Sequence, residues 1–166
     1  MLTSQLLTYV AFFVLAAIAL IGAFLAVTLR NLVRAALGLI LSFMGVAGIY
    51  FVLEAEFVAI VQVIIYVGAI SVLILFAIML TRGLMTSTAS AENSQWVAAA
   101  FVALLVFAIL FFVAFTTNWP AAPAPSISDL IPKLGTELIT TYLLPFEAVS
   151  LLLLAALVGA IVIARE

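Results

Sequence analysis

The chain has 166 residues, 69% of them hydrophobic and 7% charged, which excludes a water-soluble globular domain, since such domains are about half apolar and about one-quarter charged. Cysteine and histidine are both absent, which removes the usual protein ligands of iron–sulfur clusters, structural zinc and haem. With a net charge of -2 and a pI near 4.9 the chain offers no basic surface for nucleic acid, so we expect the lipid bilayer as its surroundings.

Apolar stretches long enough to cross a membrane recur along the chain. A helix needs about 20 residues to span roughly 30 Å of hydrocarbon. No Lys or Arg precedes the first stretch, which is also longer than the core of a secretory signal, so we expect it to be retained. The predicted fold is an all-α integral membrane protein, a single membrane domain of residues 1–166. Its five predicted transmembrane helices lie at residues 7–29, 35–53, 57–80, 96–117 and 145–164.

The connections between these helices carry most of the charge. A tight basic turn follows the first helix, and the acidic turn Glu54-Ala-Glu56 follows the second. The longest connection, residues 118–144, begins with a Pro-rich stretch and is predicted to contain a short interfacial helix near residues 127–134. Because basic residues concentrate on the cytoplasmic side, their distribution predicts an outside N-terminus and a cytoplasmic C-terminus. In this five-helix topology, one side of the membrane carries Arg30, Arg34, Arg82 and Arg165, and the other side carries Lys133.

Small residues recur along one side of several predicted helices. In lipid, such faces let two backbones approach closely. The sequence leaves open whether these faces pack within this chain or on other subunits. The residues are Ala16, Ala19, Ala23 and Ala26 in the first helix, Gly38, Ser42, Gly45 and Gly48 in the second, and Ala155 and Gly159 in the last.

The third predicted helix has no charge but does carry polar side chains. Gln62 and Tyr66 lie four residues apart and so share one face of an α-helix, and Gly68 and Ser71 follow closely. Polar groups at this depth are satisfied by neighbouring helices or by water. Taken alone, the spacing favours Gly68 as a close-packing residue and Tyr66 as an ordinary core phenol.

Two segments resemble a known family. The third-helix string Ala59-Ile-Val-Gln-Val-Ile-Ile-Tyr-Val-Gly-Ala-Ile-Ser-Val-Leu73 resembles the third helix of the J (ND6-like) subunit of complex I, the NADH-quinone oxidoreductase NDH-1. The string Leu144-Pro-Phe-Glu-Ala-Val-Ser150 and the apolar run after it resemble the fifth helix of the same subunit. The helix number and the long loop before the last helix agree as well.

The resemblance implies a non-redox membrane-arm subunit of a complex that couples quinone reduction to proton translocation. The NADH:quinone oxidoreductase activity would then belong to the assembled complex, together with FMN, iron–sulfur clusters and quinone, and this chain would have no catalytic centre of its own. The implied partners are the membrane subunits K, H and A and the antiporter-like subunits N, M and L. The implied location is the cell membrane, or a thylakoid-type membrane in a photosynthetic organism.

The resemblance also implies a conformational gate in the third helix. A π-bulge, an extra residue within one helical turn, is expected at Tyr66, Val67 and Gly68, with Gln62 and Ser71 as the polar face. Switching between π and α windings would rotate the residues after Gly68 by about 100°.

Three acidic residues are candidates for a proton path. Glu54 and Glu56 lie in a turn, where solvated loop acids are the simpler interpretation. Glu147 follows Pro145 in the predicted first turn of the last helix, where the helix dipole stabilises an acid; an outer-side role in proton transfer is the alternative. The ionisable groups of a complete path would have to come mainly from partner subunits.

Three other functions stay open. The Leu144–Ser150 segment and the short C-terminal end also resemble the G subunit of ferredoxin-linked photosynthetic NDH-1. A small stand-alone transporter would need polar residues lining its own bundle. A purely structural helix bundle would need no moving part.

Overall fold

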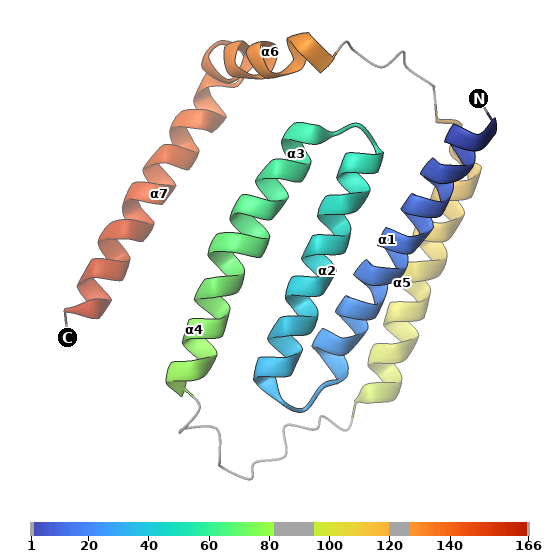
Figure 1. Cartoon of the computed structure of the whole chain (residues 1–166). Coiled ribbons are helices and arrows are strands. Elements are labelled where there is room, and N and C mark those ends of the chain that lie inside the picture. The colour runs from blue at the N-terminus through green and yellow to red at the C-terminus, as the bar shows by residue number, and fades with distance from the viewer. Residues whose placement is uncertain (1, 82–94, 120–126, 166) are drawn as a thin grey trace. The chain divides into compact units, whose positions relative to one another are not determined.

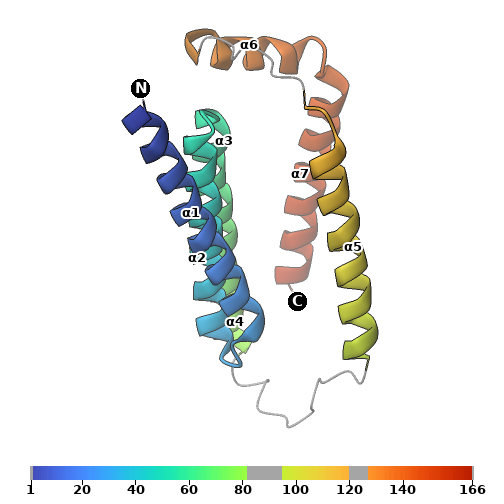
Figure 2. The same cartoon turned by 90° about the vertical axis from the view of Figure 1, so that its right-hand side faces the viewer.

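The computed structural model describes residues 2–81, 95–119 and 127–165, and within these ranges the regular structure is entirely helical. Five helical rods are long and apolar enough to cross a membrane, so the predicted all-α fold with five transmembrane helices is confirmed. The third rod is a continuous helix made of α3, η1 and α4 (Figures 1 and 2). The elements are α1 (Leu2–Thr28), α2 (Leu32–Val52), α3 (Glu56–Val61), the π-helix η1 (Gln62–Ile70), α4 (Ser71–Thr81), α5 (Trp96–Thr116), α6 (Ile127–Ile139) and α7 (Leu143–Ala164).

Local capping explains where α2 begins, three residues before the predicted start. The Asn31 side chain accepts hydrogen bonds from the backbone N–H groups of Val33 and Arg34, at 3.1 and 3.2 Å. An Asn at this position satisfies donors that have no partner inside the helix. The turn from α1 to α2 is therefore only three residues long.

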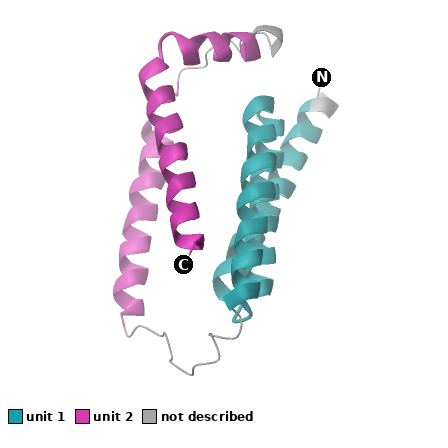
Figure 3. Cartoon of the chain, turned by 90° about the vertical axis from the view of Figure 1, so that its left-hand side faces the viewer, with its two compact units in different colours: residues 1–92 teal, residues 93–166 magenta. Residues whose placement is uncertain are grey.

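The chain packs as two compact units, residues 1–92 and residues 93–166 (Figure 3). In the first unit, α2 contacts α1 on one side and the third rod on the other (Figure 1). That residues 1–166 form a single membrane domain in the bilayer stays a prediction. Arg82 and the Pro-rich stretch at 120–125 lie outside the described residues.

Glycines on both helices bring α1 and α2 into backbone contact. A Cβ added at Gly22 would lie 2.4 Å from the Ser42 backbone nitrogen, and one at Gly45 would lie 2.6 Å from that of Ala19. No side chain fits at these distances, so the two backbones touch directly, as small-residue faces allow in lipid. Packing within the chain is thus confirmed for the α2 face. On α1 the sequence analysis missed Gly22, whereas Ala23 is exposed.

The opposite face of α2 meets the third rod. Ala36, Phe43 and Ala47 are spaced by seven and four residues and so share this face. Ala47 is 1% exposed, and Ala59 on α3 is fully buried. The Phe43 ring packs edge-on against Tyr66, with ring centroids 5.4 Å apart. This face positions the π-helix.

Threonines terminate three of the membrane spans in the same way. The hydroxyls of Thr28, Thr81 and Thr116 donate to the carbonyl four residues earlier, at 2.7, 2.9 and 2.7 Å. Each of these hydroxyls thereby finds its hydrogen-bond partner within its own helix. Such bonds are favoured where the surroundings are apolar and offer no other partner.

The second unit leaves its membrane spans uncovered. No residue of α5 or α7 is buried, and α6 contacts α7. Because α5 is apolar around its whole circumference and α7 is apolar except near Glu147 and Ser150, lipid or neighbouring protein must cover them. Gly159 of α7 has nothing within 4 Å of an added Cβ, so no described helix of the second unit packs on the small-residue face predicted there.

Candidate functional site in the third membrane span

The candidate site is the π-helix η1, which spans Gln62–Ile70 and includes Tyr66, Val67 and Gly68. At its end, the backbone N–H of Ser71 bonds to the carbonyls of Gly68, three residues earlier, and of Tyr66, five residues earlier. In an α-helix the acceptor would be Val67, four residues earlier. The ladder has therefore slipped by one residue over this segment, which is the arrangement that π-helices adopt and that often marks functional sites.

Ser71 holds this slipped ladder with its side chain as well. Its hydroxyl donates to the Tyr66 carbonyl at 2.6 Å, so that one carbonyl accepts bonds from both the backbone and the side chain of Ser71. Ser71 is only 2% exposed. A buried hydroxyl needs a partner, and here the π winding supplies one.

Gln62 and Ser71 are both buried because of the π winding. They lie nine residues apart, which in a regular α-helix of about 3.6 residues per turn is two and a half turns and would put them on opposite sides. Yet Gln62 is 9% exposed and Ser71 2%. The unit's other helices lie against one side of this rod, so the extra residue in η1 turns both polar side chains toward protein.

Tyr66 and Gly68 are less enclosed than a core position would be. Tyr66 is 43% exposed beyond its contact with Phe43. A Cβ added at Gly68 would meet a single atom within 4 Å among the described residues, the Val63 carbonyl oxygen at 3.4 Å, which is an ordinary van der Waals distance. No described helix of this unit packs closely enough to require a glycine there. Contacts within the unit therefore do not support the interpretation of Gly68 as a close-packing residue.

Glu54 ends α2 in a left-handed conformation. Its φ is 59°, its N–H bonds to the Phe51 carbonyl at 3.1 Å, and the Ala55 N–H bonds to the Tyr50 carbonyl at 2.9 Å. This pair of bonds is a Schellman motif, which normally places a glycine at that position. Glu54 is exposed, as is Glu56, the first residue of α3. The structure gives Glu54 a chain-turning role that needs no acid.

Glu147 lies deeper in α7 than the sequence predicts. The helix begins at Leu143, so Pro145 is its third residue and Glu147 its fifth. Pro145 fits there because the first N–H groups of a helix have no partner inside it. The predicted first-turn position of Glu147 is therefore wrong, and the dipole effect, which falls off within the first turn, does not explain the acid. Glu147 is an exposed carboxylate one turn inside an apolar span.

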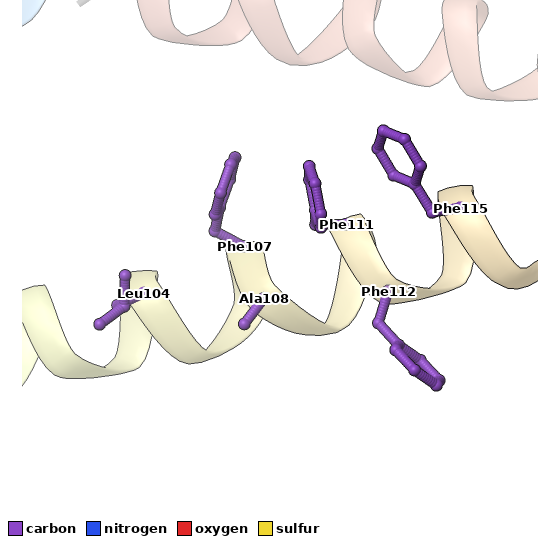
Figure 4. A pocket seen from close by; sticks show the side chains of 6 residues that line it. All are labelled: Leu104, Phe107, Ala108, Phe111, Phe112 and Phe115. Carbon is purple, nitrogen blue, oxygen red and sulfur yellow. The ribbon is translucent and has the colours of Figure 1, made fainter.

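The groove on α5 offers no chemistry. Leu104, Phe107 and Phe111 line it with Ala108, Phe112 and Phe115 (Figure 4). Every one of these side chains is a hydrocarbon, so the groove has no group for acid–base work. Within the described ranges no three acidic side chains come together, and the sequence has neither His nor Cys, so no ligand set for a metal is present there.

Comparison with known proteins decides the family. Residues 22–163 match the model of the family described as NADH-ubiquinone/plastoquinone oxidoreductase chain 6. This match covers most of the chain, including η1 and nearly all of α7. The chain belongs to this family.

Relatives from three organisms align with most of this chain. NAD(P)H-quinone oxidoreductase chain 6 of Leptolyngbya boryana is 45% identical over 95% of this chain and 79% of the relative. The chloroplastic subunit 6 of Adiantum capillus-veneris is 39% identical over 89% of this chain and 79% of the relative. The F(420)H(2) dehydrogenase subunit J of Methanosarcina mazei is 38% identical over 93% and 89%. The resemblance inferred from the third and last helices is confirmed, and this chain 6 homologue is a multi-pass membrane subunit of a quinone oxidoreductase complex.

Sequence reasoning missed two parts of the site. Phe43, which packs on Tyr66, comes from α2, and its place in an ordinary apolar helix gave no signal. The hydroxyl of Ser71 was assigned to a polar face, whereas it bonds to the backbone of its own helix. A serine five residues after the tyrosine is the one local signal that points to that bond.

Proposed function

We propose that this chain is a non-redox membrane-arm subunit of a complex I type enzyme that couples quinone reduction to proton translocation, and that η1 is its conformational gate. Membership of the chain 6 family supports the place in the enzyme. The single observation that carries the gate is the slipped ladder at Tyr66 to Ser71, in a span that bears no charge between Phe57 and Leu80.

The two windings would present different side chains to the surroundings. If η1 returned to an α-helix, the Ser71 N–H would bond to Val67 and everything beyond would rotate by about 100°. Val72, Leu73 and Phe76 are 63%, 68% and 60% exposed, so little packing among the described residues of the first unit opposes their movement. An apolar side chain turned into a narrow water file interrupts it by dewetting. The gate would therefore work by moving hydrocarbon, with no titration of its own.

Partner subunits would supply the titratable relay. A path across the bilayer needs readily ionisable groups near its middle, and η1 has no Asp, Glu, Lys, Arg or His. We assign that role to the K, H, A and antiporter-like N, M and L subunits, with FMN, iron–sulfur clusters and quinone held elsewhere in the complex. Of this chain's acids, Glu147 is the best placed for an accessory role, because Glu54 has a conformational explanation and Glu147 has none.

The electron donor lies outside this chain's proposed role. Relatives of comparable identity are named for NAD(P)H and for F(420)H(2). We propose that the same membrane subunit serves complexes with different donors, which keeps the ferredoxin-linked photosynthetic enzyme, in a thylakoid-type membrane, as the alternative assembly. A stand-alone transporter is disfavoured because the buried polar side chains among the described residues of the first unit are Gln62 and Ser71, and neither carries a charge.

Substitution at Gly68 tests the gate in the assembled enzyme. We expect Gly68→Val to lower quinone reduction and proton translocation together by about five- to tenfold, because a bias of about 1 to 1.4 kcal/mol between two windings changes a rate by that factor. Gly159→Val is the matched control, since Gly159 is also open in this chain but lies in a regular α-helix. Tyr66→Phe then asks whether the phenol takes part. Unchanged rates in Gly68→Val and Tyr66→Phe enzymes, with normal assembly, would reduce η1 to a scaffold.

A further inference from the structure

Outside the third span, the clearest segregation of side chains is on α6, a helix of 13 residues. At about 100° per residue, four of its apolar positions fall within an arc of about 100°. Leu130, Ile131, Leu134 and Leu138 form what we name the apolar stripe. Lys133 and Thr136 lie on the polar side, Glu137 lies at the edge of the stripe, and Ile139 lies outside it. The structured helix is longer than the predicted 127–134 and runs to Ile139, because the stripe continues to Leu138.

Within the second unit the apolar stripe is only partly covered, by contact of α6 with α7. Ile131 is 62% exposed, Leu138 43% and Leu134 36%. Pro132 interrupts the helix on the polar side, where its missing N–H leaves the Ser128 carbonyl without its usual partner. A carbonyl that has lost its helical partner is satisfied by water, which requires that its side of the helix be wet. The helix thus needs two different surroundings on its two sides.

The membrane surface is the boundary that α6 can reach. Only residues 140–142 separate its end from the start of α7, which is a membrane span, and three residues cannot carry α6 more than about 14 Å away. Tyr142 in this joint is 55% exposed, and Trp119, just after α5 at the other end of the same connection, is 69% exposed. Exposed Tyr and Trp at the ends of spans mark the headgroup level. Figures 1 and 3 show α6 lying across the start of α7.

We propose that α6 is a membrane-surface anchor, whose apolar stripe inserts at the boundary between lipid headgroups and acyl chains where α5 ends and α7 begins. Its sequence has one basic and two acidic residues, so insertion depends on apolar area and not on attraction to anionic lipid. Through the three-residue joint, the anchor fixes the depth of α7. Glu147, five residues beyond the joint, is held just inside the hydrocarbon boundary.

Single cysteines test the anchor, since the chain has none of its own. Full-length chain in nanodiscs of zwitterionic lipid would carry an environment-sensitive fluorophore at Ile131→Cys or Leu138→Cys, with Lys133→Cys and Thr136→Cys as matched polar-side controls. We expect lipids brominated on the acyl chain to quench the first pair at least about twofold more than the controls, and aqueous iodide to show the reverse order. The order should persist when anionic lipid is added. Equal iodide quenching at all four positions, or quenching that requires anionic lipid, would overturn the proposal.

The assembled complex decides between lipid and protein as the cover. A photo-reactive side chain at position 131, in membranes that contain the whole enzyme, should give lipid adducts and no link to another subunit. A cross-link to another subunit would overturn the proposal and make the stripe a protein contact.

Discussion

At the residue scale, Ser71 is the residue whose hydrogen bonds and burial both depend on the π winding of the third span. Ser71 bonds to the Tyr66 carbonyl through both its N–H and its hydroxyl, and it shares the protein side of the rod with Gln62 only because η1 contains an extra residue. A neutral hydroxyl can thereby favour one of two windings. The π and α windings differ from each other by only a few hydrogen bonds. A single bond worth about 1 kcal/mol is therefore enough to shift the populations of the two windings severalfold.

Removing the Ser71 hydroxyl should weaken the π winding. We expect Ser71→Ala to shift the balance toward α by about 0.5 to 1.5 kcal/mol and to change the coupled rate of the complex while leaving assembly intact. Ser150→Ala is the control, because Ser150 donates to the Glu147 carbonyl at 2.7 Å in a regular α-helix. The measurement is proton translocation per quinone reduced, in sealed vesicles. Equal values for the two variants would mean that the hydroxyl only fills space.

A glycine at position 54 should stabilise the turn between α2 and α3. The left-handed φ of 59° is unfavourable for Glu and easy for Gly, so we expect Glu54→Gly to raise the free energy of unfolding by about 0.5 to 1 kcal/mol. Glu54→Gln keeps the strained backbone and should show no gain. Reversible unfolding of the full chain in mixed micelles measures both. A loss of stability in Glu54→Gly would show that the carboxylate itself holds the turn.

Such details were beyond the sequence for a definite reason. Regular α-helical spacing puts Gln62 beside Tyr66 and sets Ser71 on the opposite side, and the π winding breaks that spacing. Only the resemblance placed a π-bulge at Tyr66 to Gly68. The depth of Glu147 was misjudged because Pro145 was taken as the first helical residue, although the third position also lacks an acceptor inside the helix.

At the element scale, the helices were predictable and their pairings only partly so. Apolar length alone located all five membrane spans to within a few residues. Small residues identified the packed face of α2, where Gly38 and Gly45 meet α1. On α1, however, the contact runs through Leu15, Ala19, Gly22 and Ala26, and a stripe of alanines did not distinguish this face from the exposed Ala23. Shape complementarity depends on both backbones together, so the sequence of one helix alone does not show which of its faces fits the other helix.

A methyl group at Gly22 should separate α1 from α2. The added Cβ would lie 2.4 Å from the Ser42 nitrogen and 2.8 Å from the Gly38 oxygen, both backbone atoms that cannot rotate away. We expect Gly22→Ala to lower the free energy of unfolding by about 1 to 3 kcal/mol, the range for overpacked sites. In Gly159→Ala the new methyl meets open space, so this control should be neutral or gain up to about 1 kcal/mol from helix propensity. Equal effects in the two variants would contradict the close contact.

At the scale of the whole molecule, the exposed surface argues for an assembly. Within the second unit no described residue of α5 or α7 is buried, and Phe107, Phe111 and Phe115 are 65%, 54% and 76% exposed along one face of α5. Lipid could cover such surfaces, but an exposed carboxylate at Glu147 is costly against acyl chains alone and is better matched by a polar group on a neighbour. Composition predicted the membrane; family membership identifies the enzyme to which the neighbours belong.

Purification should recover this chain with its neighbours. In mild detergent we expect it to migrate with the other membrane subunits of the oxidoreductase and to lose that association in harsh detergent. Isolated chain in liposomes should move no protons under a pH gradient, because no charged side chain is buried among the described residues of its first unit. Proton transport by the isolated chain would favour a stand-alone transporter.

The winding of residues 62–71 in the intact complex tests the central claim most directly. Structures of the enzyme at rest and during turnover would locate the acceptor of the Ser71 N–H in each state. We expect the Tyr66 carbonyl in one state and the Val67 carbonyl in the other, with Val72, Leu73 and Phe76 rotated together. A ladder that keeps the Tyr66 acceptor in every state of the working enzyme would contradict the gate.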